Sequence, residues 1–182
     1  MSKVTRRRKG QRGFTLIEIM VVVAIIAILA AVIIPSWMKE GRKGKFDPEI
    51  RAMFAEIQVR EEQYKAEAGA GSYRALGTCP ATTSSAGVDL LAQSCYDANW
   101  TAARVQPSDK SIRCTYAVTV GAAGTTPTAP TGFSLPTNVS SYATAWFYIL
   151  GTCDMDANSS TTAATFFTAS WDQSVQKQNY GQ

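Results

Sequence analysis

The sequence offers few side chains that could carry out catalysis. Histidine is absent from all 182 residues, which removes the usual general base of Ser-His-Asp and Cys-His sites and the commonest metal ligand. The remaining residues form no recognisable nucleophile site and no pair of catalytic acids. We therefore expect a protein that is not an enzyme and that carries no cofactor.

The cysteines are a second group with chemical potential. Cys79, Cys95, Cys114 and Cys153 are spaced too widely for a CxxC zinc or redox motif. In an exported domain, four such cysteines are typical of two disulfide bonds. Three pairings are possible, and we favour Cys79–Cys95 with Cys114–Cys153, because the second bond would tie one predicted strand to the end of its neighbour.

One acidic stretch has the spacing of a calcium loop. Asp154, Asp156 and Asn158 alternate as in the opening of an EF-hand loop. The pattern then fails, because Ser159 stands where a glycine is required and Thr165 where a bidentate Glu is required. We favour an Asx-rich turn between two strands over calcium binding, and we expect no resident metal.

Glu18 is the single ionisable side chain in a long apolar run. Residues 14–34 read FTLIEIMVVVAIIAILAAVII, and a helix of this length would measure roughly 32 Å, enough to span a bilayer core of about 30 Å. A carboxylate near the centre of such a span costs about 2.5–3.5 kcal/mol. Two interpretations stay open: Glu18 has a partner in an assembly, or it lies near the headgroups and is solvated.

A basic leader precedes the apolar run. Six Lys and Arg residues and no acid lie in residues 1–13, which favours a cytoplasmic N-terminus and export of the rest of the chain. The net charge of +4 comes from this leader, because the rest has 12 basic and 14 acidic residues. We therefore expect no nucleic-acid contact by the folded head. A secretory signal peptide is the rival interpretation, but the apolar run is long and lacks a clean A-x-A cleavage site.

The basic leader, the apolar run and the junction Gly13-Phe14-Thr15-Leu16-Ile17-Glu18 between them together resemble the class III signal of the type IV pilin superfamily. This family includes the pseudopilins of type II secretion and competence systems. The resemblance covers roughly the first 35 residues. It implies that a prepilin peptidase cuts after Gly13 and methylates Phe14, and that Glu18 attracts the N-terminal amine of a neighbouring subunit. Such a buried pair of opposite charges costs less than either charge alone.

The resemblance also implies a function. The chain would be a structural subunit of a type IV pilus, as major or minor pilin, in a filament that serves adhesion, motility or secretion. Its partners would be other pilin subunits, the prepilin peptidase, an inner-membrane assembly platform and, before assembly, the membrane. The precursor would lie in the inner membrane with its head on the periplasmic side, and the mature chain in an extracellular pilus. The alternatives are a pseudopilin, or a single-pass membrane protein with a non-polymerising, ligand-binding exported domain.

Two helices should position these residues. Pro35 is expected to kink the first helix or melt it near Ala31, either as a device that extends on assembly or as a plain membrane-exit kink. Asp47 and Pro48 have the residue types of an N-cap and of the first helical position, so a second helix should restart there and end at Gly69. Its apolar stripe should pack on a sheet and comprises Ile50, Met53, Phe54, Ile57 and Tyr64. The polar remainder comprises Arg51, Glu56, Arg60, Glu61 and Lys65.

Three strands complete the prediction. Residues 112–120 alternate cleanly, and segments 146–150 and 165–171 are rich in aromatic residues, whereas 70–110 is expected to be a long connection and 121–136 a loop. The inner face of the first strand should contain Cys114, Tyr116, Val118 and Val120. An antiparallel sheet packed on a helix makes the fold class α+β. The predicted organisation is a removed leader (1–13), a transmembrane and assembly helix (14–35), an amphipathic helical segment (36–69) and an exported head (70–182).

Overall fold

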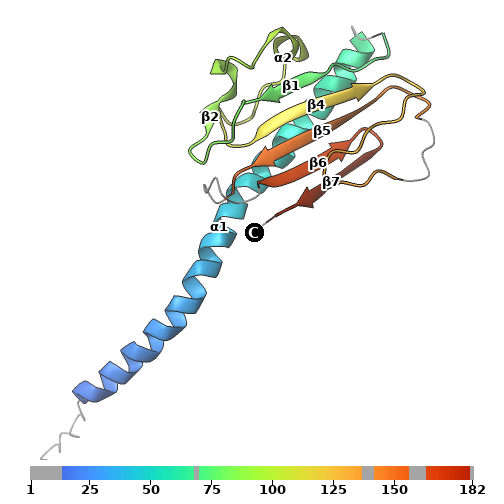
Figure 1. The fold of residues 1–182 in the computed structure, drawn as a ribbon. Coiled ribbons are helices and arrows are strands. Elements are labelled where there is room, and N and C mark those ends of the chain that lie inside the picture. The colour runs from blue at the N-terminus through green and yellow to red at the C-terminus, as the bar shows by residue number, and fades with distance from the viewer. Residues whose placement is uncertain (1–13, 68–69, 137–141, 156–162, 181–182) are drawn as a thin grey trace, which may run out of the picture. The chain divides into compact units, whose positions relative to one another are not determined.

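The computed structural model describes residues 14–67, 70–136, 142–155 and 163–180. The chain divides into two compact units, Met1–Met38 and Lys39–Gln182. The elements, in chain order, are α1 (Leu16–Glu67), β1 (Leu76–Cys79), β2 (Val88–Asp89), a 3-10 turn (Leu90–Ala92), α2 (Ala98–Ala103), β3 (Ser111–Ile112), β4 (Thr115–Gly121), β5 (Trp146–Cys153), β6 (Ala164–Ala169) and β7 (Asp172–Gln178) (Figure 1).

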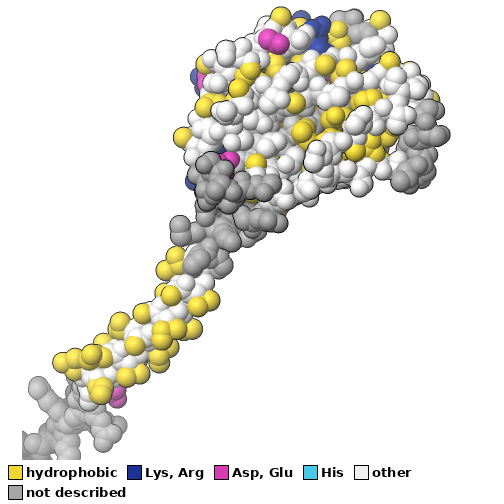
Figure 2. Space-filling model, in the orientation of Figure 1, with side chains coloured by type: hydrophobic (Ala, Val, Ile, Leu, Met, Phe, Trp, Pro, Cys, Tyr) yellow, Lys and Arg dark blue, Asp and Glu magenta, His cyan; other side chains and the backbone are white. Residues whose placement is uncertain are grey.

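The first part of α1 is apolar on every side. The stretch Leu16–Ile34 is long and apolar enough to cross a membrane, and none of it is buried in the chain's own fold. Figure 2 shows hydrophobic side chains along the visible face of this stretch. A helix without a polar face is stable only when lipid or other apolar surfaces cover it.

The backbone of α1 is helical without interruption, which corrects two predictions. The helix continues through Ala31 and Pro35, so no stretch is melted there, and the kink at Pro35 stays a prediction. It also continues through Asp47 and Pro48, so the predicted restart with a new N-cap is wrong. A proline removes one hydrogen bond of the helix, and the burial of neighbours such as Ile50 stabilises the helix more than that loss destabilises it.

The head contains a five-stranded antiparallel sheet in the order β1-β4-β5-β6-β7. The predicted α+β class is therefore confirmed. Strands β4, β5 and β6 correspond to the three predicted strands, with two corrections. The first strand begins at Thr115, because Ile112 belongs to β3. The third strand ends at Ala169, and Trp171 lies in the turn that follows. The edge strands β1 and β7 were not predicted, and β2 and β3 form a separate two-stranded ladder.

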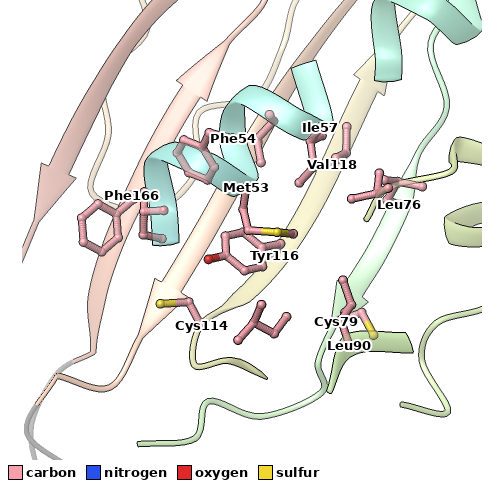
Figure 3. Packing of buried hydrophobic residues seen from close by; sticks show 14 of the residues in the cluster. Met53, Phe54, Ile57, Leu76, Cys79, Leu90, Cys114, Tyr116, Val118 and Phe166 are labelled. Atoms are coloured by element: carbon pink, nitrogen blue, oxygen red, sulfur yellow. The ribbon is translucent and has the colours of Figure 1, made fainter. Parts of the chain in front are cut away.

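Within the head, α1 covers one face of the sheet (Figure 1). Four residues of the predicted stripe are at most 2% exposed and Tyr64 is half-buried. Figure 3 shows three of the four, Met53, Phe54 and Ile57, beside Tyr116 and Val118 of β4. Burial of each such side chain contributes roughly 1.5–3 kcal/mol. The fully buried members of the stripe are Ile50, Met53, Phe54 and Ile57.

The inner face of β4 follows the predicted alternation. Cys114, Tyr116 and Val118 are buried, and Val120 is partly buried against the same core. On the other face Thr119 is exposed and Thr115 is buried, so the alternation is clear only in the second half of the strand.

Two disulfide bonds tie the head together. Cys79 is bonded to Cys95 with Cα atoms 5.4 Å apart, and Cys114 to Cys153 with Cα atoms 4.4 Å apart. This is the pairing favoured from the sequence. The second bond joins the start of β4 to the end of β5, and the first joins β1 to the loop before α2. Such bonds typically contribute about 2–4 kcal/mol each.

Glu49 attaches α1 to β4 by polar contacts. Its Oε1 accepts hydrogen bonds from the backbone N–H groups of Arg113 at 2.8 Å and Cys114 at 3.0 Å, and from the Tyr116 hydroxyl at 3.0 Å. The Arg113 guanidinium lies 3.6 Å from Oε2. Hydrogen bonds to a charged group contribute about 1.5–3 kcal/mol each, so this carboxylate fixes the helix along the sheet.

Glu61 is a second buried carboxylate, although the sequence placed it on the polar face. Its side chain is 0% exposed. Oε2 accepts a hydrogen bond of 2.8 Å from the backbone N–H of Arg74, and Oε1 has no partner among the described residues. The pKa of Glu61 is raised to about 7, above all by burial; the hydrogen bond and the charge of Arg74 oppose this rise, and the charge of Glu62 adds to it.

The raised pKa makes stability depend on pH. Between pH 4.5 and about 7 the folded state holds a proton on Glu61 that the unfolded state has lost, so the stabilisation is complete below pH 4.5 and lost as the pH rises through about 7. In the wild type, the free energy of unfolding should fall by roughly 1–3 kcal/mol over this range, and in Glu61→Gln this fall should be absent. Chemical denaturation of the full chain in uncharged micelles, followed by near-ultraviolet circular dichroism, measures this. Glu67→Gln, at an exposed position, is the matched control. If the free energy of unfolding of Glu61→Gln changed with pH as that of the wild type does, the assignment would be contradicted.

Gly151 of β5 permits the close approach of α1. A methyl group at this position would lie 3.0 Å from Ile50 Cδ1 and 3.1 Å from Phe54 Cε1. We expect Gly151→Val to lower the free energy of unfolding by about 1–3 kcal/mol, because it overpacks the core. Gly77→Val in β1 is the control, since no heavy atom lies within 4 Å of the added methyl group. Equal unfolding midpoints for the two variants would refute this packing.

Candidate assembly site at the N-terminus

The predicted site residues lie where α1 begins. The helix begins at Leu16, directly after Phe14 and Thr15. Phe14 is 84% exposed, and Gly13 lies outside the described residues. The predicted cleavage junction is therefore adjacent to the first turn of the helix, and Glu18 lies within that turn.

Thr15 and Glu18 form a capping box. Oε2 of Glu18 accepts hydrogen bonds of 2.8 Å from both the backbone N–H and the hydroxyl of Thr15. In return, Thr15 Oγ1 accepts a hydrogen bond of 3.3 Å from the backbone N–H of Glu18. This reciprocal arrangement satisfies N–H groups that have no partner within the helix.

This role of Glu18 was not predicted from the sequence, where only a partner in another subunit or solvation at the headgroups was expected. The T-x-x-E spacing before an apolar run was the signal that could have revealed the cap. The cap does not exhaust the carboxylate, because both hydrogen bonds from Thr15 go to Oε2 and neither goes to Oε1. An ionised carboxylate has about four acceptor positions, so Glu18 can cap its own helix and accept a further donor.

The other predicted residues lie elsewhere. Pro35 lies inside α1, and all four cysteines are in disulfide bonds, so none is a free nucleophile. Of the calcium candidates, Asp154 follows β5, whereas Asp156 and Asn158 lie outside the described residues. The described part of the chain contains no group of three or more acidic or cysteine side chains placed to hold a metal ion. The expectation of an Asx-rich turn without a resident metal therefore stays a prediction, because two of its three residues lie outside the described part of the chain.

Comparison with known proteins points to the same end of the chain. Residues 8–34 match the family described as the prokaryotic N-terminal methylation motif. The chain is 56% identical over 41 residues to the type II secretion system core protein G of Klebsiella michiganensis, covering 22% of this chain and 28% of the relative. It is 54% identical over 43 residues to the type IV major pilin protein PilA of Myxococcus xanthus, covering 24% and 20%.

A third relative is the type IV wide pilus major component PilA4 of Thermus thermophilus. The identity is 42% over 57 residues, covering 31% of this chain and 43% of the relative. The chain thus spans between about a fifth and two fifths of the length of these relatives. No solved structure matches the chain.

The fold agrees with these similarities, because a long N-terminal apolar helix and an antiparallel sheet are the parts of a type IV pilin fold. Residues 8–34 therefore match the prokaryotic N-terminal methylation motif, and at this end the chain is similar to type IV pilins and to a core protein of type II secretion systems.

Proposed function

We propose that this chain is a structural subunit of a type IV pilus, cut after Gly13, methylated on Phe14 and assembled through α1. The observation that carries the proposal is the start of α1. There a capped carboxylate, Glu18, stands at the head of a helix whose apolar side chains are exposed on every side. The methylation motif at residues 8–34 supports the processing steps.

The apolar stretch Leu16–Ile34 determines where the chain is stable. In the precursor, the lipid bilayer covers these side chains, and in a filament the same helices of other subunits cover them. Small residues at helical spacing lie within this stretch and permit close approach of neighbouring helices: Ala24, Ala27 and Ala31. Filament entry therefore exchanges one apolar environment for another.

Glu18 fixes the axial position of one helix relative to its neighbour. Cutting after Gly13 creates an α-amino group on Phe14, next to the capping box in the chain. In an apolar surrounding, an unpaired ammonium and an unpaired carboxylate are both costly, and pairing them removes much of this cost. Because the cap holds Glu18 in the first turn, its charge is presented at one depth, and a neighbouring helix whose amine reaches that depth is favoured.

The head acts as a structural module in this proposal. The described cysteines are all oxidised and the sequence has no histidine, so we assign it no catalysis. The leader with its six positive charges orients the precursor with its head on the periplasmic side of the inner membrane. The prepilin peptidase and an assembly platform are the partners that such a precursor requires.

A pseudopilin is the second candidate, favoured by the similarity to type II secretion system core protein G. The geometry of the capping box and the apolar helix serves both functions equally. The amount and length of filament on the cell surface separate them, because a pilus extends beyond the cell. A single-pass membrane protein that never polymerises is the alternative of a different class.

Processing is the first test. We expect the mature chain to begin at Phe14 with one added methyl group, because the motif covers the junction. Intact-mass spectrometry of the chain from membranes and from sheared surface filaments measures this. Gly13→Leu is the matched variant and should remain uncut, since a bulky side chain hinders close approach of the backbone to a protease. An uncut wild-type leader, or a cut beyond Ala31, would overturn the pilin proposal.

The second test separates the two roles of Glu18. Gln can replace Glu in a capping box, so Glu18→Gln keeps the cap and removes the charge, whereas Glu18→Ala removes both. We expect both variants to be processed and to enter filaments at least about tenfold less than wild type, because charge pairing is lost. Immunoblots of sheared filaments against membranes measure the ratio.

Thr15→Val is the control for the cap, since it keeps the carboxylate and removes the hydroxyl. The backbone N–H of Thr15 still donates to Glu18 Oε2 in this variant, so it should assemble less well than wild type and clearly better than Glu18→Gln. Normal assembly of Glu18→Gln, with failure of Glu18→Ala and Thr15→Val, would show that Glu18 acts only within its own helix.

A further inference from the structure

Three arginines surround a small pocket in the head. The pocket has a volume of about 160 Å³ and lies between the last turns of α1, the segment before β1 and the end of α2. Its size is below the range of about 300–1,000 Å³ that is usual for drug-sized ligands. The polar residues that line it are Arg60, Gln63, Tyr64, Glu67, Arg74 and Arg104.

Arg74 is held firmly but is not fully satisfied. Its two terminal nitrogens donate hydrogen bonds to Asn99 Oδ1 at 3.1 Å and to the Tyr64 hydroxyl at 3.0 Å. The guanidinium lies over the Tyr64 ring, 4.4 Å from its centroid. Its Nε is buried and has no partner among the described residues. A buried N–H on a charged group is costly to leave unpaired.

Arg104 is available for a ligand. Its side chain is exposed and makes no hydrogen bond or ion pair with the described residues. It caps α2 in the left-handed backbone region, at φ 56° and ψ 30°. Glycine or asparagine fits that conformation best, so the backbone conformation does not account for an arginine at this position.

The charges at the pocket do not balance. Arg60 is engaged by Glu56 at 2.8 Å and by Gln63 at 3.1 Å, and Glu67 is the one carboxylate in the lining. The negative ends of α1 and α2 favour nearby cations, and this explains the sign of the charges. It explains neither the unpaired Nε of Arg74 nor the unpaired guanidinium of Arg104.

We propose that this pocket binds a small oxyanion, phosphate or sulfate, as a free ion or as an ester group. Guanidinium groups offer paired N–H donors that match the oxygens of such anions. Arg74 and Arg104 are the binding residues, and the Tyr64 ring and Asn99 position Arg74. Basic side chains are visible on the upper part of the head in Figure 2. The site does not depend on filament formation.

Titration of the full chain in uncharged micelles at low ionic strength tests this proposal. Inorganic phosphate in one arm and glycerol 1-phosphate in the other are followed by phosphorus NMR and by the melting temperature. We expect saturable binding and a rise in melting temperature. Arg104→Gly should weaken binding about tenfold, because one charged donor pair is lost. The variant should keep its fold, since glycine suits the left-handed conformation.

Arg51→Gln is the matched control, because it removes one exposed positive charge of α1 that does not line the pocket. It should bind phosphate as wild type does. Binding in both arms assigns the site to a phosphoryl group, and binding of inorganic phosphate alone assigns it to the free ion. Absence of saturable binding in both arms, or equal weakening by Arg51→Gln and Arg104→Gly, would overturn the proposal.

Discussion

The apolar surface of Leu16–Ile34 is the constraint on which the rest of this molecule depends. A helix that exposes isoleucine, valine and leucine on all sides cannot persist alone in water, because each side chain would keep apolar area in contact with solvent. This stretch therefore needs an apolar cover, either lipid or other helices, wherever the chain is. The head has to fold without help from this stretch, and its own core lies within Lys39–Gln182.

The head folds without the apolar stretch because one helix and one sheet form its core. One face of α1 supplies Ile50, Met53 and Ile57 to the core, and the sheet supplies the opposing layer. Because the connections are long, two disulfide bonds and the carboxylate of Glu49 fix elements that apolar contacts alone would hold less firmly. A second buried acid, Glu61, acts in the opposite direction, because its ionisation near neutral pH opposes folding.

The elements that were predicted correctly from the sequence are those with a strong local pattern. The apolar stripe and the alternation around Tyr116 were correct, because burial imposes periods of 3.6 and 2 residues. The edge strands were missed for a physical reason: β1 has only four residues, and β7 is polar, with Gln176 and Lys177 where alternation is hard to recognise. Such strands form because a neighbouring strand offers hydrogen bonds, which single-sequence patterns do not reveal.

The false restart at Asp47 and Pro48 has a similar origin. These residues have the types of a helix start, but in the structure Asp47 pairs with Lys177 of β7 at 3.0 Å and α1 continues. Tertiary burial of Phe46 and Ile50 on either side overrides the local signal. Glu61 was misplaced for the converse reason, since its charge indicated solvent while its position on the helix faced the core.

The cap at Thr15 changes how Glu18 should be understood. An unrestrained glutamate would lose side-chain freedom when it paired with an amine, and this loss would offset part of the attraction. Here Oε2 is already bound to Thr15 before any neighbour arrives, so much of that entropy is lost within the helix itself. Capping and pairing are therefore compatible and reinforce each other. A carboxylate held in place by its own helix is better prepared to accept the charge of another.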